Sequence, residues 1–394
     1  MFDNIRGFIG GNPQGSDAIY ESEGLRANAN SIENGYASVG LAGNGFYTKP
    51  SEYGVNGTQY MYVAIRRPMP VPETSASVFA LSNQVSTSGQ PAATSGFVVD
   101  GQIRSYTPGS SSYPMLFSRL TSTPSYVQRV VTSSNDGIYN YGNLSDNNFD
   151  VMNGTGNSNL GGTSTNIINF LFKRAHSFFD VVCYRGDGIG SSSSFNHNLG
   201  VAPEMIWLKR RDTYNGAQHW VCWHKDLDSS NPAHKYLRLN KDENIADDDG
   251  KWNDTEPTSS VFTVGNHTDV NNQNGDFTAW LFATTAGVSK VGSYTGDGST
   301  DGSKVINCGF SNGAKFVVIK GLADNHHWVE FNTNSSAGIV AGNDSAGRLN
   351  TGDARVTSED IIDPNSTGFA VLRNSTDNKV NENGVTYIFL AIAA

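Results

Sequence analysis

Charge, cysteine and long apolar runs are all scarce in this 394-residue sequence. Charged residues make up 16% of the chain and leave a net charge of −10, and no basic cluster is longer than Lys209-Arg210-Arg211, which excludes nucleic acid as an expected partner. No run approaches the roughly 18 apolar residues of a membrane span, and no signal peptide is expected. The cysteines, Cys183, Cys222 and Cys308, are widely spaced, which predicts buried free thiols rather than disulfides or a metal site.

Glycine, small polar residues and aromatic side chains fill the sequence instead. It contains 43 Gly, and aromatic residues make up 11% of it. Short apolar runs rich in Val, Ile, Tyr and Phe alternate with clusters of Gly, Asn, Asp, Ser and Thr. This alternation is typical of strands joined by turns, and no amphipathic helix with caps interrupts it. The sequence therefore predicts an all-β fold.

The chain repeats itself with a period of about 109 residues. The repeat is visible in three pairs of segments: "FFDVVCYRGDG" (178–188) with "VSKVGSYTGDG" (288–298), His219-Trp220-Val221 with His327-Trp328-Val329, and Arg238-Leu239-Asn240 with Arg348-Leu349-Asn350. A closing apolar strand recurs as well, and its copies align at Ala64, Lys173, Ala283 and Ala391. Several anchors in one order indicate tandem units rather than chance similarity.

These repeats divide the chain into four parts. We expect a partial (half) repeat over 1–72, a divergent β repeat over 73–177, and two clear repeats over 178–286 and 287–394. The length and strand spacing of a full unit predict a two-sheet β-sandwich. Tandem sandwiches in turn predict an elongated, fibre-like chain. Since a partial unit exposes strand edges, we expect residues 1–67 to be completed by a strand of another chain or to act as a docking segment.

Five segments of the chain together form a characteristic combination: "MYVAIRRPM" (61–69), "NHNLGVAPEMIWLKRR" (196–211), "TSSVFTVG" (258–265), "VSKVGSYTG" (288–296) and "YIFLAIA" (387–393). In this combination the chain resembles the repeated β-domains of tail fibre and adhesin proteins of marine tailed bacteriophages, including cyanophages. The resemblance covers nearly the whole chain and is best over 178–394. It transfers no catalytic residues.

The resemblance implies a virion structural protein that is made in the host cytoplasm and located in the extracellular phage tail. It implies a homotrimer used for attachment to a host-surface glycan or protein receptor. Residues 1–67 would then contact other tail proteins of the virion. Two alternatives stay open: a polysaccharide depolymerase tailspike with a carboxylate pair at a subunit boundary, and a head fibre or capsid decoration protein.

Arg185-Gly186-Asp187 has the form of an integrin ligand, but the repeat favours a turn. The corresponding residues of the next unit are Thr295-Gly296-Asp297, so the Gly-Asp-Gly element recurs while the Arg does not. Gly accepts positive φ, and Asp accepts hydrogen bonds from nearby backbone N–H groups. We therefore predict a hairpin turn after the first strand of a unit.

No catalytic or metal-binding pattern stands out in the sequence. The acidic segments 246–254 and 296–302 lack EF-hand spacing, which predicts solvated loops with at most a weak calcium site. His219 and His327 are equivalent positions before a Trp, which favours a structural role over zinc binding. Since no nucleophile elbow is present and no carboxylate pair is singled out, we expect no enzyme activity and no cofactor.

Aromatic side chains on loops beside Asn and Asp are candidates for glycan contact. By this criterion we select Trp223, His224 and Trp252 as the glycan-binding residues, because loop residues that differ between units are freer to take on a function. Trp223 aligns with Phe331 of the next unit, so a position in the core is the alternative for this residue.

Overall fold

The computed structural model describes the chain in separate stretches. Backbone and side chains are described for residues 57–65, 69–82, 95–105, 113–118, 120, 168–188, 192–211, 219–333, 338–373 and 375–394, and several further strands are described by their backbone alone. Most of the predicted partial repeat, residues 1–72, lies outside these stretches.

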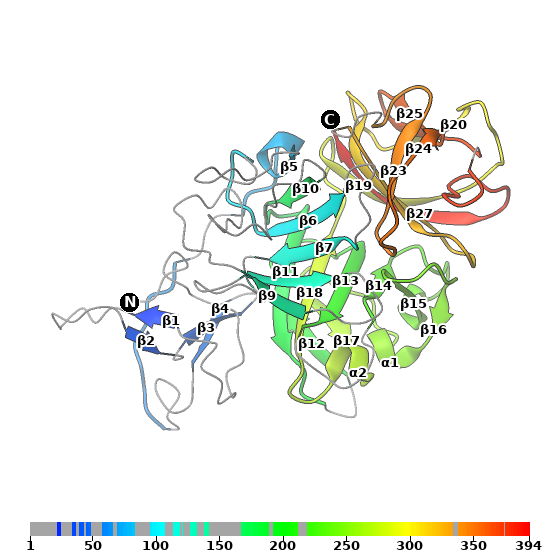
Figure 1. The fold of residues 1–394 in the computed structure, drawn as a ribbon. Coiled ribbons are helices and arrows are strands. Elements are labelled where there is room, and N and C mark those ends of the chain that lie inside the picture. Colours follow the sequence, from blue (N-terminus) through cyan, green and yellow to red (C-terminus); the bar gives the residue numbers. More distant parts are fainter. Residues whose placement is uncertain are drawn as a thin grey trace.

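Three six-stranded antiparallel sheets dominate the described chain (Figure 1). The first contains β5 (Phe79–Ser82), β6 (Gly101–Tyr106), β7 (Met115–Ser118), β8 (Val127–Val131), β9 (Ile138–Tyr141) and β10 (Ile167–Phe172). The second contains β11 (Phe179–Arg185), β13 (Met205–Arg210), β14 (Val221–His224), β15 (Lys235–Arg238), β16 (Ala246–Asp247) and β18 (Asp276–Phe282). The third contains β19 (Ser289–Thr295), β21 (Ala314–Gly321), β22 (Trp328–Asn332), β23 (Asp344–Arg348), β24 (Val356–Glu359) and β27 (Thr386–Ala393).

The three sheets have the same strand order. In each sheet the strand that comes last in the sequence lies in second place, next to the first strand: β5-β10-β6, β11-β18-β13 and β19-β27-β21. We call β10, β18 and β27 the closing strands. Each sheet lies within one of the predicted repeats 73–177, 178–286 and 287–394, which we call the first, second and third unit.

Smaller elements complete the structure. The second unit adds a sheet of β12 (Ser193–Asn196) and β17 (Val261–Val264), and the third adds a sheet of β20 (Lys304–Asn307), β25 (Ile362–Asn365) and β26 (Gly368–Val371). Two hairpins precede the units: β1 (Ser22–Gly24) with β2 (Asn34–Tyr36), and β3 (Val39–Ala42) with β4 (Gly45–Thr48). The helices whose bounds the structure describes are single turns, namely α1 (Asp249–Trp252), α2 (Thr268–Asn271) and the 3-10 turns Ser75–Ser77 and Pro232–His234. The predicted all-β class is confirmed, and no helix in the described stretches is long and apolar enough to cross a bilayer.

The six-stranded sheets of the second and third units are buried on both faces. All seven residues of β18 are buried, for example. Trp280 and Phe282 point to one side of the sheet, whereas Ala279 and Leu281 pack on the other side with residues of β12 and β17. Two-sided burial explains why these strands are continuous apolar runs in the sequence.

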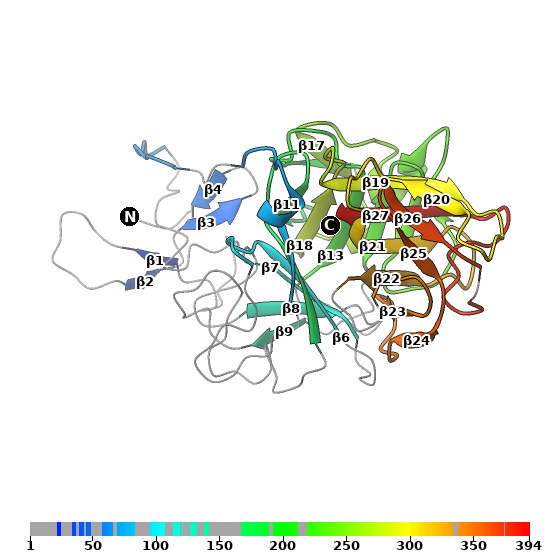
Figure 2. The same ribbon diagram turned by 90° about the horizontal axis from the view of Figure 1, so that it is seen from above.

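One hydrophobic core, which we call the shared core, contains residues of all three units. Figure 2 shows from above the sheets that contribute these residues. The ring centroids of Phe172 and Phe282 lie 6.0 Å apart across the first and second units, and those of Trp207 and Trp328 lie 6.1 Å apart across the second and third. Across the first and third units, the ring centroids of Phe79 and Phe316 lie 5.4 Å apart. The expected elongated, fibre-like arrangement is therefore wrong for these units, because their sheets surround one core instead of following one another along a rod.

The structure also corrects the alignment of the closing strands. The Ala283 N–H donates to the Phe178 carbonyl at 3.1 Å, and the Ala393 N–H donates to the Val288 carbonyl at 2.9 Å. The structural equivalent of Ala283 is therefore Ala393, two residues beyond the one that the sequence alignment selected. A shift of two residues leaves every strand side chain on the same face, so the apolar pattern alone does not detect it.

Candidate functional site

Each Gly-Asp-Gly segment is hydrogen-bonded to one asparagine of its own unit. The Asp187 N–H donates to Asn271 Oδ1 at 3.1 Å, and Asn271 Nδ2 donates back to Asp187 Oδ1 at 3.0 Å. Asp297 and Asn381 make the same pair of bonds in the third unit, both at 3.0 Å. A Cβ on Gly186 would lie 2.2 Å from a backbone carbonyl oxygen, so a larger residue does not fit there. This repetition at equivalent positions indicates a structural device.

The Arg-Gly-Asp tripeptide lies on a crossover between two sheets. Among the described strands β11 pairs with β18 alone, and the chain then passes to β12 of the smaller sheet. The predicted hairpin is therefore wrong, although Gly188 has the positive φ of +60° that a turn requires. The Arg185 guanidinium donates a 3.0 Å hydrogen bond to the Asn274 side chain of the same unit. That contact holds the arginine against its own scaffold.

The three residues predicted to bind glycan lie in the interior. Trp223 is 3% exposed, His224 is fully buried, and Trp252 is 2% exposed. Both tryptophans belong to the core between the two sheets of the second unit. Burial lowers the pKa of His224 to about 3, and its Nδ1 accepts the Asp226 N–H at 3.0 Å. The prediction of an exposed aromatic platform is wrong for this chain, because loop-like composition does not reveal which aromatic side chains fill a core.

In each of the last two units, the Asn of the repeated Arg-Leu-Asn segment contacts both residues of the repeated His-Trp segment. Asn240 accepts the Trp220 N–H at 3.2 Å, and its Nδ2 lies 3.0 Å from His219 Nδ1. In the third unit, Asn350 accepts the Trp328 N–H at 3.0 Å and lies 2.8 Å from His327 Nδ1. The expected structural role of these histidines is thus what their geometry supports.

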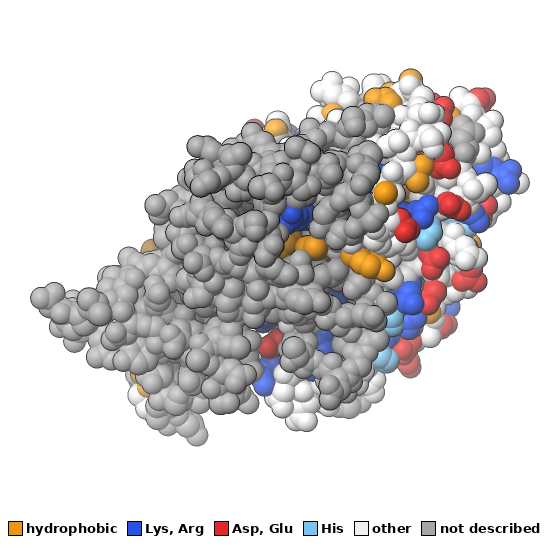
Figure 3. Space-filling model, in the orientation of Figure 1, with side chains coloured by type: hydrophobic (Ala, Val, Ile, Leu, Met, Phe, Trp, Pro, Cys, Tyr) orange, Lys and Arg blue, Asp and Glu red, His pale blue; other side chains and the backbone are white. Residues whose placement is uncertain are grey.

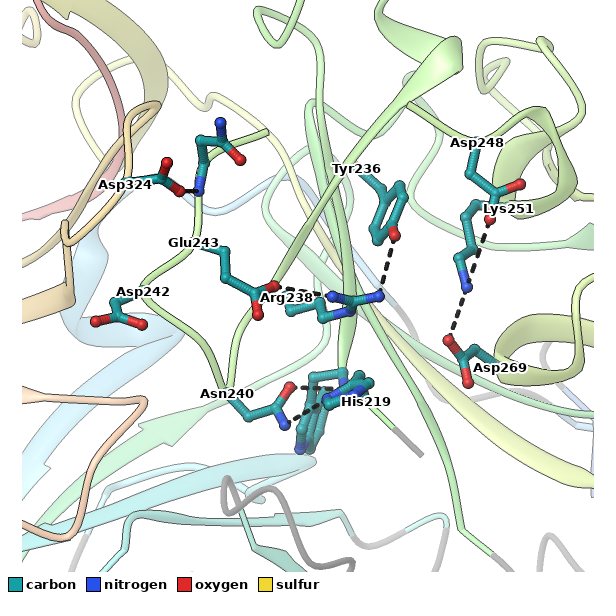
Figure 4. A network of polar contacts seen from close by, with 12 residues as sticks. His219, Tyr236, Arg238, Asn240, Asp242, Glu243, Asp248, Lys251, Asp269 and Asp324 are labelled. Atoms are coloured by element: carbon teal, nitrogen blue, oxygen red, sulfur yellow. Dashed lines mark hydrogen bonds and ion pairs between the residues drawn. The ribbon is translucent and has the colours of Figure 1, made fainter. Parts of the chain in front are cut away.

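A polar junction connects the second unit to the third, and Figure 4 shows its Asp324 beside the segment that carries Asp242 and Glu243. The Lys320 ammonium donates to three backbone carbonyls, those of Glu243 at 2.8 Å, His326 at 2.7 Å and Asp242 at 3.4 Å. Burial lowers the pKa of Lys320 to about 7, while the three acceptors match the three protons of its charged form. The Asn244 N–H donates to Asp324 at 3.0 Å beside it. Lys320 therefore holds the loop after β15 against β21.

A second polar cluster lies around Lys251 in the second unit. The Lys251 ammonium, whose side chain is 1% exposed, lies 2.7 Å from Asp269 Oδ2 and 2.8 Å from His267 Nδ1. It also lies 5.1 Å from the centre of the Tyr236 ring. Burial lowers the pKa of Lys251, and the Asp269 carboxylate opposes that effect. The backbone position equivalent to Lys251 in the third unit is Ile361, whose carbonyl accepts the corresponding bond.

Sequence reasoning did not find this Lys251 cluster. Its members are 16 to 18 residues apart along the chain, and none belongs to a recognisable motif. Comparison of the two repeats offered one signal for it. The second unit has Lys251 at the position where the third unit has the apolar Ile361.

Fully buried acids in the described stretches are engaged by structural partners. Asp180 accepts Arg174 Nε at 2.5 Å and two backbone N–H groups. Glu330 is paired with Arg355, and Asn332 donates to it at 2.7 Å. Asp344 accepts the backbone N–H groups that follow β24, and burial raises its pKa to about 7. None of these carboxylates faces solvent, so their geometry favours stabilisation of the fold over catalysis.

The acidic loops bind their own backbone and neighbouring lysines. Asp248 accepts the Gly250 N–H at 2.9 Å and so caps α1, and Asp247 lies 2.7 Å from Lys235 Nζ. A hydrogen-bonding Ser299 lowers the pKa of Asp297 to about 2. No group of three or more His, Cys, Asp or Glu side chains in the described part of the chain has the geometry to hold a metal ion.

An exposed group of hydrogen-bonding side chains remains at the outer end of the second unit. We call it the polar face, and it consists of His234, Lys235, Asp247 and Asp254. His234 and Asp254 have side chains that are 41% and 40% exposed, and their atoms Nε2 and Oδ1 lie 3.1 Å apart. Figure 3 shows acidic, basic and histidine side chains gathered along the side of the molecule formed by the second and third units. Such side chains can exchange hydrogen bonds with the hydroxyl groups of a sugar.

Comparison with known proteins identifies one family. No curated protein matches the chain. A family model described as a domain of unknown function, DUF7483, matches residues 138–394, which include the second and third units entirely. The match covers more than half of the sequence, and the chain therefore belongs to the DUF7483 family.

Proposed function

We propose that the chain is a bacteriophage virion structural protein, a tail fibre or adhesin subunit that attaches the particle to the host-cell surface. The proposal rests first on the resemblance of its repeated segments to phage tail fibre and adhesin domains. The all-β scaffold supports it, because such scaffolds hold binding loops rigidly on a protein surface. Its location would be the phage tail outside the host, following synthesis in the host cytoplasm.

The observation that most favours attachment over a purely structural role is the polar face of the second unit. Its side chains are 22% to 61% exposed and face solvent although His234 pairs with Asp254 and Lys235 pairs with Asp247, whereas the nearby Lys251–Asp269 pair is buried. Shallow polar surfaces bind single sugars weakly, and several copies on one particle would multiply that affinity. A host-surface glycan is therefore the receptor class that we favour, with a protein receptor as the other possibility for the same surface.

Binding of the purified chain to whole marine bacterial cells and to an array of bacterial surface polysaccharides tests this proposal. The double variant His234→Ala, Asp254→Ala is expected to lower binding at least tenfold. Asp377→Ala, at a carboxylate that is 74% exposed in the third unit, is the matched control and is expected to bind normally. Unchanged binding of the double variant would remove the polar face from the proposal, and no binding to any cell would remove attachment itself.

A polysaccharide depolymerase tailspike is the enzymatic alternative. It requires two carboxylates that flank a glycosidic bond in a solvent-accessible site. The fully buried acids of the described chain do not meet that requirement, which is why we favour a non-enzymatic protein. Steady release of reducing ends from a bound polysaccharide, abolished by replacement of one exposed acid, would reverse this preference.

A head fibre or capsid decoration protein is the second alternative. It shares the scaffold and differs in its place on the particle, so labelling of the chain on assembled virions would distinguish head from tail.

A further inference from the structure

One lysine and one aspartate of the second unit are buried against each other. The side chains of Lys251 and Asp269 are 1% and 8% exposed, and Lys251 Nζ lies 2.7 Å from Asp269 Oδ2. Trp252 and Val270, the residues that follow them in the sequence, belong to the core between the two sheets of this unit. Figure 4 shows Lys251 between Asp269 and the more distant Asp248, whose Oδ2 is 3.9 Å from Nζ. Asp269 is therefore the carboxyl group in closest contact with the buried amine.

The third unit folds in the same way without this pair. A tyrosine hydroxyl contact that recurs in both units places Lys379 at the position of Asp269. Ile361 occupies the position of Lys251. The repeated scaffold thus does not require a buried lysine and aspartate, which directs attention to what the two groups can do together.

Burial favours the neutral forms of both groups. It lowers the pKa of Lys251, although the Asp269 carboxylate opposes that effect. Transfer of one proton from Nζ to Oδ2 across 2.7 Å would convert two buried charges into a neutral amine and a neutral carboxylic acid. A neutral amine is a nucleophile, and a protonated carboxyl group is its electrophile. Fixed contact between the two replaces the high concentration that the same reaction needs in solution.

His267 contacts both of these groups. Its Nδ1 lies 2.8 Å from Lys251 Nζ and 3.5 Å from Asp269 Oδ2, and the Asp269 N–H donates to the same atom at 3.0 Å. Burial lowers the pKa of His267, which keeps the ring neutral and able to accept a proton. The imidazole can therefore take a proton from the nitrogen and return it to the oxygen.

We propose that Lys251 and Asp269 condense after folding to form an intramolecular isopeptide bond, with His267 as the catalytic residue. The neutral Lys251 Nζ attacks Asp269 Cγ and forms the N–C bond. His267 accepts a proton from this nitrogen and donates it to the departing hydroxyl group, so the C–O bond breaks and one water molecule leaves. The step requires no oxidant or reductant, and exclusion of water from the site disfavours its reversal.

The bond would join α1 to α2, which lie on either side of β17 in the sequence. It would therefore keep β17 against the second unit even when neighbouring contacts open. The inference goes beyond the proposed function and does not depend on it, because the reaction involves this chain alone.

Peptide mapping of the denatured wild-type chain by mass spectrometry tests the inference. Trypsin cuts after a lysine only when its amine is free, so the cross-link should leave residues 242–290 as one peptide. That peptide should be lighter than its sequence by the mass of one water molecule. Further digestion with chymotrypsin, which cuts after Trp252, should yield two segments joined through Lys251 and Asp269.

Two variants and one internal control sharpen the test. Asp269→Ala should restore both the full mass and cleavage after Lys251. His267→Ala should slow cross-linking about tenfold or more in a time course after cell-free synthesis. The control is Lys235, whose Nζ also lies 2.7 Å from a carboxylate, that of Asp247, which is 61% exposed. Since water surrounds that pair, trypsin should cut after Lys235 in the wild type.

Complete cleavage after Lys251 in a wild-type chain of full mass would overturn the inference. So would a loss of water that leaves Lys251 open to trypsin, because ring closure at Asp249-Gly250 gives the same change in mass without a cross-link. An equal rate in His267→Ala would contradict the role assigned to the histidine. The wild-type measurement does not depend on the folding of any variant, and cell binding has no influence on it.

Discussion

The indole Nε1 of Trp328 donates a 2.9 Å hydrogen bond to the backbone carbonyl of Arg238, which belongs to the neighbouring unit. Trp207 lies in the same core with its ring centroid 6.1 Å away, but its Nε1 has no hydrogen-bond partner among the described residues. Both side chains are at most 1% exposed. They therefore combine equal burial with unequal hydrogen bonding.

Trp328→Phe is expected to destabilise the chain more than Trp207→Phe. Both changes remove similar apolar volume, but only the first breaks a hydrogen bond between units. The Arg238 carbonyl still accepts the Lys241 N–H at 3.2 Å, so the expected cost of the lost bond is about 0.5–1.5 kcal/mol. Urea denaturation followed by circular dichroism would measure the difference in free energy of unfolding. Equal losses in the two variants would show that the bond between the units contributes nothing net.

Glu330→Gln tests the buried ion pair of the third unit. The side chains of Glu330 and Arg355 are 0% and 2% exposed, so the substitution leaves a buried guanidinium without its counter-charge. The expected loss of stability is about 3–5 kcal/mol. Asp353→Asn breaks the Arg348–Asp353 pair, whose carboxylate is 61% exposed, and should cost about 0–1 kcal/mol. A loss below about 1 kcal/mol for Glu330→Gln would contradict this account.

Lys320 should make stability depend on pH. Burial lowers its pKa from the usual 10.5 to about 7, so the unfolded chain binds more protons than the folded chain between these values. Stability contributed by this group therefore rises as pH increases from about 7 to 10.5 and is lost as pH falls through that window, by a few kcal/mol at about 1.4 kcal/mol per pKa unit.

The comparison of two lysine variants isolates that effect. Lys320→Met should abolish this part of the pH dependence, and Lys290→Met, at a half-buried position of β19, should retain it. Denaturant midpoints measured at several pH values from about 7 to 10 provide the two slopes. Parallel curves for Lys320→Met and the wild type would mean that the three carbonyl acceptors restore a normal pKa.

Tyr184 and Tyr294 offer a test of equivalence between units. The Tyr184 hydroxyl donates to the Val270 carbonyl at 2.6 Å, and the Tyr294 hydroxyl donates to the Val380 carbonyl at 2.6 Å. Replacement of either tyrosine by Phe should cost about 1–2 kcal/mol, and the two losses should agree. Thermal unfolding of both variants checks this, and a loss in one variant only would show that the repeated bond has different roles in the two units.

Much of the local structure could be predicted from the sequence. Apolar runs bounded by Gly, Asn and Asp located the strands, and the repeat of Tyr184 at Tyr294 correctly paired two positions with the same hydroxyl contact. The alignment of Ala283 with Ala391 was wrong by two residues, because strand alternation has a period of two and tolerates such a shift.

The arrangement of the units could not be predicted in the same way. A strand buried on both faces reads as apolar throughout, and nothing in that pattern says whether its second face meets a small sheet or a neighbouring unit. Trp223 illustrates the same difficulty for the site, since the polar residues His224 and Lys225 follow it along the chain while its contacts in space are apolar. The Lys251–Asp269 pair was missed because only the fold brings these side chains together.

The shared core makes the three units dependent on one another for folding. A single unit separated from the others would expose one whole sheet face, which carries Phe172 in the first unit, Trp280 in the second and Phe316 in the third, so it is not an autonomous folding unit. Unfolding of the three should then be one cooperative event. The same dependence constrains evolution: substitutions on the inner face of one unit must suit the other two, whereas the outer loops can diversify independently.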